Sequence, residues 1–304
     1  MKKIYALSAM LLATVLWGFA FSAQSSGMNF VGAMQFVALR SIVGVAALVI
    51  VIAVLDIVLR KRITVWGDAA DDKNRKRLLA GGILCGTVIS CASTFQQLGL
   101  LYVTAGKTGF LTALYIIIVP LLGIFCRRRT PFLLWVAVLL ALAGAYLLCG
   151  GVSNIGIGEI FVMICALLFA LHIMIIDHFA ADCDCVRLSC VQFMAATVVS
   201  AIASLIFREK WLWDNIMASL PFWVFCGLGS SAAAFTLQMF AQKYLHPAAA
   251  ALIMSLESVF AVLGGWLFLN EMLSWRELAG CGVILVAVIA AQLPGWWKNN
   301  RKNV

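Results

Sequence analysis

The chain is built from runs of about 20 apolar residues that follow one another with short polar connections. A helix rises about 1.5 Å per residue, so a run of this length crosses the roughly 30 Å of hydrocarbon in a bilayer. Ten such runs occur, and the connections leave no length for a separate soluble domain. The predicted spans are residues 5–24, 32–59, 78–101, 108–126, 132–150, 158–177, 188–207, 221–242, 247–269 and 273–293.

Composition agrees with this interpretation. Hydrophobic residues make up 64% of the chain and charged residues only 12%, and the mean hydropathy is +1.03. A soluble domain carries about 25% charged residues, and its core could not absorb so much apolar surface. We therefore predict an all-α integral membrane protein for which the lipid bilayer is part of the solvent.

The first run has a second interpretation. Residues 1–3 (MKK) precede an apolar stretch, and the small residues at 20–23 (AFSA) resemble the cleavage site of a signal peptide. The run is nevertheless long enough to span, and its removal would leave nine helices and spoil the internal repeat described below. We expect a membrane span here.

Lysine and arginine in short loops mark the cytoplasmic side of a membrane protein. Of the 22 lysines and arginines, 17 fall on the side of the N-terminus and Arg40 falls within a span. The four on the opposite side are Lys107, Arg208, Lys210 and Arg276. Both termini are therefore predicted to be cytoplasmic, with the protein in the cell membrane. The net charge of +9 then reflects a basic face beside anionic lipid, and no nucleic-acid partner is expected.

Nothing in the sequence resembles catalytic machinery or a metal site. Most of the ten cysteines fall in or at the ends of spans, and the cluster at 182–185 (DCDC) is on the predicted cytoplasmic, reducing side. The three histidines are scattered, and no phosphate-binding glycine loop occurs. We expect neither an enzyme nor a cofactor. Tryptophans that fit an aromatic belt at the membrane–water interfaces are Trp211, Trp213, Trp296 and Trp297.

An internal repeat appears when the chain is shifted by 142 positions. Residues 93–115 (STFQQLGLLYVTAGKTGFLTALY) then align with residues 235–257 (FTLQMFAQKYLHPAAAALIMSLE), and the register holds across a loop. The aligned pairs include Thr94 with Thr236, Gln96 with Gln238, Tyr102 with Tyr244, Leu114 with Leu256 and Tyr115 with Glu257. A second, shorter similarity joins residues 35–44 and 192–201.

The repeat divides the chain into halves at residues 1–150 and 151–304. Because each half has an odd number of predicted spans, five, the two halves enter the membrane from opposite sides. This arrangement, two inverted five-helix repeats, is typical of secondary transporters and predicts alternating access to a site between the halves.

Glu257 interrupts the ninth apolar run near its middle, about 16 Å deep at 1.5 Å per residue. A carboxylate there costs several kcal/mol unless it is paired, protonated or facing water, so it should point into the bundle. Arg40 is the other side chain clearly charged at comparable depth, and the two could form an ion pair between the halves. Two interpretations of Glu257 stay open: a site for a substrate amine or a proton, and a structural anchor hydrogen-bonded to neighbouring helix backbone.

Glycine-rich segments suggest close contacts between helices. Residues 80–86 (AGGILCG), 227–235 (GLGSSAAAF) and 264–266 (GGW) place small residues on successive turns. In a membrane such positions let helix backbones approach and pack by dispersion.

The whole chain resembles the EamA-type transporters of the drug/metabolite transporter superfamily. The resemblance rests on residues 16–21 (LWGFAF), on Arg40 in the second span, and above all on the block from residue 246 to residue 291. The positions of that block that match the family pattern are Pro247, Ala248, Ala249, Leu256, Glu257, Val259, Phe260, Ala261, Glu271 and Gly280. Ser258 stands where the family usually has proline. The resemblance implies a secondary transporter of small organic metabolites, often an exporter of amino acids or related compounds.

Several polar and aromatic residues of the predicted spans could bind such a substrate. They offer aromatic faces, amides, hydroxyls and charges of the kind that hold organic ligands, although plain packing is an open alternative for each. The candidates are Trp17, Arg40, Gln96, Tyr102, Tyr115, Gln238, Tyr244 and Glu257.

Two classes of function follow from these observations. A transporter of a small organic metabolite requires a water-accessible cavity between the halves, lined by Arg40, Tyr115 and Glu257. A non-transporting membrane scaffold or membrane-embedded enzyme subunit would have a dry, filled interior instead. Proton coupling, and the choice between a monomer and a homodimer, stay open.

Overall fold

The structure is a computed structural model that describes residues 2–60, 63–67, 71–127, 130–148, 155–270, 272 and 274–292. All regular secondary structure within these residues is helical, as predicted. Some predicted features lie outside the described residues. They are the boundary between the halves at residues 150 and 151, Glu271 of the block that resembles the family, Trp296 and Trp297.

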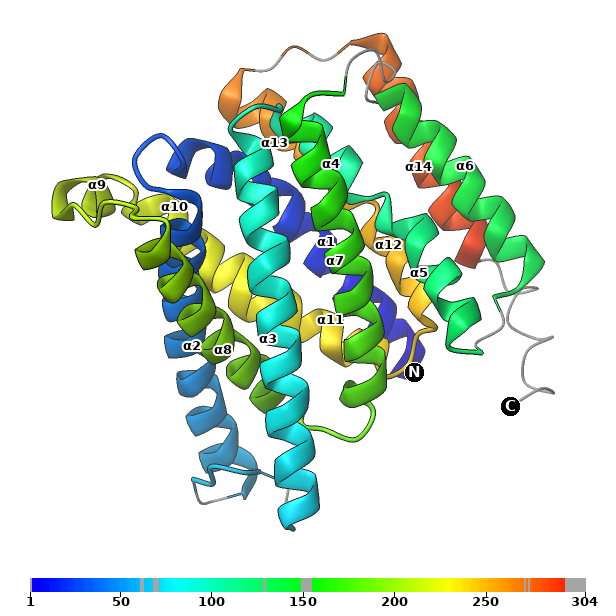
Figure 1. Cartoon of the computed structure of the whole chain (residues 1–304). Helices are drawn as coiled ribbons and strands as arrows, with labels where there is room; N and C mark the ends of the chain where they lie inside the picture. Colours follow the sequence, from blue (N-terminus) through cyan, green and yellow to red (C-terminus); the bar gives the residue numbers. More distant parts are fainter. Residues whose placement is uncertain are drawn as a thin grey trace.

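The helices follow the predicted apolar runs along the chain (Figure 1). The first half contains α1 (Lys2–Gly27), α2 (Ala33–Leu55), α3 (Asp72–Leu100), α4 (Ala105–Thr112), α5 (Tyr115–Phe125) and α6 (Phe132–Leu148). The second contains α7 (Ile157–Ala180), α8 (Cys185–Ile206), α9 (Trp213–Ala218), α10 (Leu220–Phe225), α11 (Phe235–Gln242), α12 (Pro247–Met254), α13 (Glu257–Leu269) and α14 (Trp275–Gln292). A π-helical segment, Asp56–Arg60, extends α2, and another, Cys226–Ala234, joins α10 to α11.

Eight helical stretches of the described residues are long and apolar enough to cross a membrane. Five are α1, extended α2, α3, α7 and α8, and three combine shorter elements: Ala105–Phe125, Leu220–Gln242 and Pro247–Leu269. α6 is apolar but shorter. Every predicted span overlaps one of these stretches, α6 or α14. The positions of the runs therefore agree with the helices, while a count of ten membrane spans stays a prediction.

The two halves run through the fold in opposite directions (Figure 1). α1 begins at the end of the molecule marked by the N-terminus, and α7 begins at the other end. α2 packs against α8 and α6 packs against α14, and in each pair the helices are antiparallel. The four basic residues predicted to be external lie at the start of α4, between α8 and α9, and at the start of α14. These positions share the end of the molecule opposite the N-terminus.

Helices of both halves share one core rather than forming two separate bundles. α3 packs against α7 and α8, and α1 packs against α11 and α13. The largest cluster of buried apolar side chains includes Met10 and Ile89 from one half and Phe193 and Leu252 from the other. A site at the centre of this fold is therefore built from both halves.

Two of the apolar stretches are broken at matching positions. α4 and α5 are separated at Ala113 and Leu114, and α12 and α13 are separated at Ser255 and Leu256, 142 residues later. The same spacing relates the helix that follows each break, because α5 begins at Tyr115 and α13 at Glu257. Both interruptions are short, tighter turns with right-handed dihedrals, so each stretch keeps its overall helical course.

Serine side chains support the break in the second half. The Ser255 hydroxyl donates to the Leu252 carbonyl oxygen at 2.6 Å, and the Ser258 hydroxyl donates to the Ser255 carbonyl oxygen at 2.7 Å. Side-chain partners of this kind keep the backbone satisfied where a helix is interrupted away from water. Ser258 therefore accompanies a broken helix although it replaces the proline usual in the family.

The helices before the two breaks also begin at matching positions. Thr104 caps α4 by accepting the Lys107 amide at 3.3 Å, and His246 caps α12 by accepting the Ala248 amide at 3.3 Å. Thr104 and His246 are again one repeat length apart. Different side chains thus perform the same local task in the two halves, by the usual mechanism of an N-cap acceptor.

Glycines allow the close helix contacts predicted from their spacing. A methyl group on Gly227 would lie 2.8 Å from the Arg40 carbonyl oxygen, and one on Gly264 would lie 2.8 Å from the Ser22 hydroxyl. The pair α6 and α14 has the same kind of contact at Gly144, where a methyl group would lie 2.8 Å from the Gly280 oxygen. Backbone atoms lie among the near neighbours at both Gly227 and Gly144, so little relaxation is available there.

We expect Gly144→Ala to lower the melting temperature of the protein in detergent, because the added methyl group forces α6 and α14 apart. Overpacking of this size costs about 1–3 kcal/mol. Gly282→Ala on α14 is the matched control, since nothing lies within 4 Å of its added methyl group. That control should keep or raise the melting temperature, because alanine favours helix over glycine by roughly 0.5–1 kcal/mol. Equal effects of the two substitutions would contradict close packing at Gly144.

Candidate functional site

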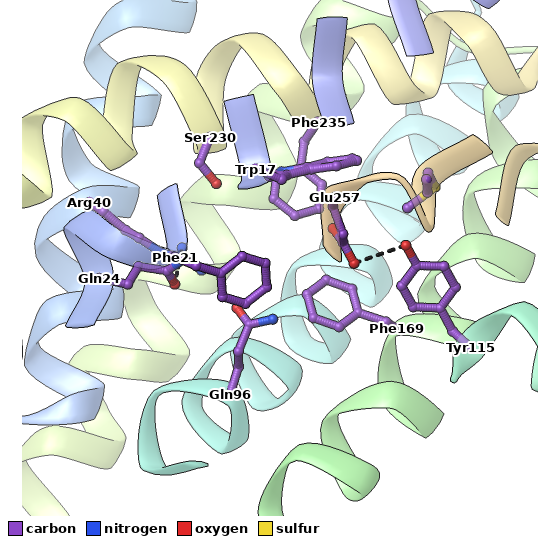
Figure 2. A pocket seen from close by; sticks show the side chains of 11 residues that line it. Trp17, Phe21, Gln24, Arg40, Gln96, Tyr115, Phe169, Ser230, Phe235 and Glu257 are labelled. Carbon is purple, nitrogen blue, oxygen red and sulfur yellow. Dashed lines mark hydrogen bonds between the residues drawn. The ribbon is translucent and has the colours of Figure 1, made fainter. Parts of the chain in front are cut away.

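A small central cavity lies between the two halves (Figure 2). Its lining comes from α1, α2, α3 and α5 of the first half, and from α7, the segment Cys226–Ala234, α11, α12 and α13 of the second. The lining residues are Trp17, Phe21, Gln24, Arg40, Gln96, Tyr115, Phe169, Ser230, Phe235, Met254 and Glu257. Five of the predicted candidates are among them: Trp17, Arg40, Gln96, Tyr115 and Glu257. The interior therefore contains a polar space where the transporter interpretation requires one.

Glu257 and Tyr115 meet across the cavity wall. The Tyr115 hydroxyl donates to Glu257 Oε1 at 2.9 Å, and the two side chains are 1% and 5% exposed. Each residue is the first of the helix that follows a break, and they are separated by the repeat length of 142. The bond therefore joins corresponding positions of the two halves.

Arg40 lies on α2 with its guanidinium directed toward neutral partners. Its Nη1 donates to Gln24 Oε1 at 3.1 Å, and its Nη2 donates to the Ser93 hydroxyl at 2.6 Å. Its Nε has no hydrogen-bond partner within the described residues, and the side chain is only 3% exposed. A buried guanidinium with neutral partners keeps its full charge within the lining.

The start of α2 is held by the other half of the chain, which fixes the position of Arg40. Glu209, in the connection between α8 and α9, accepts the Met34 amide at 3.1 Å and the Gln35 amide at 2.7 Å. A carboxylate at a helix N-terminus satisfies amides that have no partner within the helix and interacts favourably with the helix dipole.

The ion pair predicted between Arg40 and Glu257 is not formed. Among the described residues, each charged group has a neutral partner instead: Tyr115 for the carboxylate, Gln24 and Ser93 for the guanidinium. Figure 2 shows Arg40 at one side of the lining and Glu257 nearer its middle, beside Tyr115. The prediction rested on their similar depth within two predicted spans. Equal depth does not show how far apart two side chains lie in the plane of the membrane, and the predicted pairing was therefore wrong.

Aromatic side chains form much of the rest of the cavity wall. Trp17 packs edge-to-face on Phe235 with ring centroids 4.9 Å apart, and Phe169 lies 6.5 Å from Tyr115. Phe169 and Phe235 were not predicted, since an apolar residue in an apolar helix gives no signal. Gln24 was not predicted either, although a buried amide inside an apolar run is a signal that could have found it.

The two glutamines of the repeat have different positions. Gln96 lines the cavity and donates to the Thr112 hydroxyl at 3.2 Å. Gln238 makes the corresponding contact, 3.6 Å from the Met254 sulfur, and is buried outside the lining. Thr112 and Met254 are themselves one repeat length apart, so the contact is preserved while its chemistry differs. In the second half Met254, rather than Gln238, contributes to the cavity.

Tyr102 and Tyr244 lie away from the cavity. α3 ends at Leu100 and α11 ends at Gln242, so each tyrosine follows the end of its helix. They are 65% and 39% exposed. Their predicted position in the central lining is therefore corrected: they belong to the ends of the bundle, where an aromatic ring suits the membrane–water interface.

The lining has the chemistry of a binding site for a small polar organic molecule. It combines a carboxylate and a guanidinium with amide, hydroxyl and aromatic groups in one enclosed space. Largely apolar walls with a few directed polar groups are usual in sites for such ligands. Within the part of the chain that the structure describes, no group of three or more His, Cys, Asp or Glu side chains could hold a metal ion.

A bundle of membrane-length helices in two halves, with a polar cavity between them, is the architecture of a membrane transporter. The model of the EamA-like transporter family matches residues 4–150 and 156–291. The chain belongs to the EamA-like transporter family.

Two further proteins are similar to this chain. An uncharacterized transporter from Archaeoglobus fulgidus is 32% identical over 219 residues, which cover 70% of this chain and 68% of the relative. One solved crystal structure has a similar fold, with a TM-score of 0.71 and 19% identity, and the match covers 94% of this chain and 96% of that one. The resemblance found in the sequence is thus confirmed, and the protein is a multi-pass membrane transporter.

We expect Tyr115→Phe to destabilise the protein because it leaves the buried Glu257 carboxylate without its hydroxyl donor. Leaving a buried polar group without a partner costs about 1–3 kcal/mol, and more when the group is charged. Thermal unfolding in detergent measures the loss. Tyr146→Phe on α6 is the control, because Tyr146 is 54% exposed. In the double variant with Glu257→Gln, the total loss of stability should be smaller than the sum of the losses in the two single variants. A strictly additive loss would show that the hydroxyl and the carboxylate are not coupled.

Proposed function

We propose that the protein is a secondary transporter that exports small organic metabolites, amino acids or related compounds, across the cell membrane by alternating access. In this proposal ten transmembrane helices form two inverted repeats, residues 1–150 and 151–304, and both termini are cytoplasmic. The substrate binds in the central cavity among Trp17, Arg40, Gln96, Tyr115 and Glu257.

The observation that carries the proposal is the hydrogen bond between Tyr115 and Glu257. It connects the two halves at the cavity, 2.9 Å from oxygen to oxygen, at the point where two helices are broken. A ligand that engages either group changes a contact between the halves themselves. Binding can therefore bias their relative position, which is the requirement for coupling occupancy to a conformational change.

Polar contacts also join the halves at the end of the molecule that carries the N-terminus. Arg187 of α8 donates through Nη2 to both carboxylate oxygens of Asp56, each at 2.7 Å, and to the Thr64 carbonyl oxygen at 2.9 Å. Arg77 of α3 pairs with Asp182 at 2.7 Å. Arg187 and Asp56 are 5% and 1% exposed at their side chains, so this ion pair is well shielded from water.

The opposite end has inter-half contacts of its own. Lys107 at the start of α4 pairs with Glu159 at the start of α7. Glu209 accepts the first amides of α2, as described above. Contacts between the halves are therefore present at both ends of the molecule. Alternating access then consists of breaking one set of contacts while the other holds, as two packed halves rock about the site.

Glu257 is suited to respond to a ligand because its hydrogen-bond partner, the Tyr115 hydroxyl, is neutral. A carboxylate in that position can accept a substrate ammonium group or a proton, and either one neutralises a charge buried among helices. The same group as a purely structural anchor would hold the break between α12 and α13 without changing state. Transport measurements on a charge-neutral variant distinguish these roles.

Glu257→Gln should reduce transport at least about tenfold in proteoliposomes, because the amide keeps the shape of the side chain but accepts neither a proton nor an ammonium charge. The measurement is an uptake and counterflow screen with amino acids, nucleosides and quaternary amines, each with and without an imposed pH gradient. Glu277→Gln, which keeps a polar side chain beside Ser274 at the exposed start of α14, is the control. Wild-type rates for Glu257→Gln from about pH 5 to pH 8 would remove the carboxylate from the mechanism.

Asp56→Asn should loosen the end that carries the N-terminus, because Arg187 then keeps a carboxylate partner only in Asp184, 2.8 Å from Nη1, while the buried Nη2 is left with neutral groups. Removing one member of a buried ion pair commonly costs about 3–5 kcal/mol. Accessibility is measured with a water-soluble thiol reagent on Ser230→Cys, a cavity position, in an otherwise cysteine-free protein, and the labelling rate should rise several-fold over the parent.

Asp72→Asn is the matched control for this prediction. Asp72 pairs with Lys76 at 2.6 Å, but both side chains are about three-quarters exposed, at 75% and 77%. Exposed pairs of this kind contribute little. A second version of the protein, with the buried Cys85 as its single cysteine, shows whether the substitution loosens the whole fold, because labelling of Cys85 would then rise as well. The gate interpretation fails if the two aspartate variants label alike, or if Cys85 becomes reactive in parallel.

The other class of function, a non-transporting scaffold or enzyme subunit, predicts no protein-dependent flux for any solute in the screen. The enclosed cavity with both charges in its lining favours the transporter, since a scaffold gains nothing from charged groups facing an interior space.

A further inference from the structure

Arg40 carries a positive charge that no described residue balances. A guanidinium has five N–H donors in a planar fork, and within the described residues Arg40 donates to Gln24 and Ser93, both neutral. Its Nε has no partner, and no carboxylate of the described residues lies within ion-pair distance. Buried arginines are usually paired, because desolvating a charge without a counter-ion is costly.

The guanidinium is also held in place rather than free to leave the cavity. The backbone of Gly227, in the π-helical segment, packs so closely on α2 that an added methyl group would lie 2.8 Å from the Arg40 carbonyl oxygen. Gln24 and Ser93 fix the head of the side chain from two other helices. Such π-helical segments are frequently found at functional sites, and this one also contributes Ser230 to the lining.

The charge distribution of the lining is therefore asymmetric. Tyr115 lies toward one side with its partner Glu257 nearer the middle, and Arg40 with Gln24 lies at the other side (Figure 2). The two charged groups of the lining do not neutralise each other directly. A solute that places a negative group beside Arg40 lowers the cost of the buried guanidinium, whereas an organic cation raises it.

Resting on the proposed function, we propose that Arg40 binds a carboxylate group of the transported solute, so that the substrates are small carboxylate-bearing metabolites and not organic cations. Carboxylate is the anion that matches the planar fork of a guanidinium with two parallel hydrogen bonds. The Nε edge of Arg40 supplies an available donor for it. The cavity is small, which restricts it to a compact solute.

The first experiment compares solutes that differ only in the carboxylate. Wild-type proteoliposomes are tested in counterflow with the common amino acids and simple carboxylates, each beside its amino alcohol or amide, and with choline as an organic cation. Carboxylate-bearing solutes should exchange at least about tenfold faster than their partners, the ratio expected for one charge-assisted pair of hydrogen bonds. Equal exchange of amino acids and amino alcohols, or preferential exchange of choline, would overturn the inference and leave the transporter proposal standing.

The second experiment supplies Arg40 with an internal carboxylate. Gln24→Glu keeps the side chain length and places a negative group 3.1 Å from Nη1, where it competes with the solute. The KM for a carboxylate substrate should rise roughly tenfold, while the melting temperature is kept or raised. A merely structural Arg40 would be better paired in this variant, and transport would be unchanged.

Two arginine variants complete the series. Arg40→Gln removes the charge and should raise the KM more than Arg40→Lys, which keeps the charge but lacks the fork. Arg276→Gln at the exposed start of α14 is the control and should transport like wild type.

If Arg40→Gln does not fold, the result for Gln24→Glu decides the question. Absence of flux for every solute would contradict the proposed transport function, and absence of a rise in melting temperature with any of these carboxylates would then overturn the Arg40 assignment as well.

Discussion

The structure depends on keeping charged groups inside a membrane-embedded bundle. A carboxylate and a guanidinium, each at least 95% buried, survive there because helices of both halves enclose a polar space around them. This requirement links the halves, because Glu257 of the second half takes its partner, Tyr115, from the first. Glu257 takes its donor from α5, while the helix that carries Arg40 has its first amides satisfied by Glu209 of the other half.

The helix breaks follow from the same requirement. In an uninterrupted helix Glu257 would be an interior residue. Because α13 begins at Glu257, the residue instead follows directly on the interruption at Ser255 and Leu256. The hydroxyls of Ser255 and Ser258 make the interruption tolerable, because they donate to carbonyl oxygens that water cannot reach. The interruption between α12 and α13 and the polar groups at the centre of the bundle thus belong together.

Much of the fold could be predicted because the length of apolar runs decides which segments span a bilayer. Glu257 and Arg40 were found as charges inside such runs, and Tyr115 was found because the repeat aligns it with Glu257. Phe169 and Phe235 could not be found, since nothing distinguishes one buried phenylalanine from another in an apolar helix. Tyr102 and Tyr244 were placed in the cavity because alignment shows that two positions correspond, but not on which side of a helix end they lie. The predicted pairing of Arg40 with Glu257 was wrong because a residue's position along its helix does not show how far it lies from a side chain on another helix.

The contact between residues 115 and 257 has a consequence for the history of the two halves. These positions correspond, so immediately after a duplication of one ancestral half the same side chain would have faced its own copy. Two glutamates there would repel, and two such carboxylates cannot both stay ionised at close range. The present pair, a hydroxyl on one side and an acid on the other, is attractive instead. If the ancestral residue was the acid, this contact required the two copies to differ here.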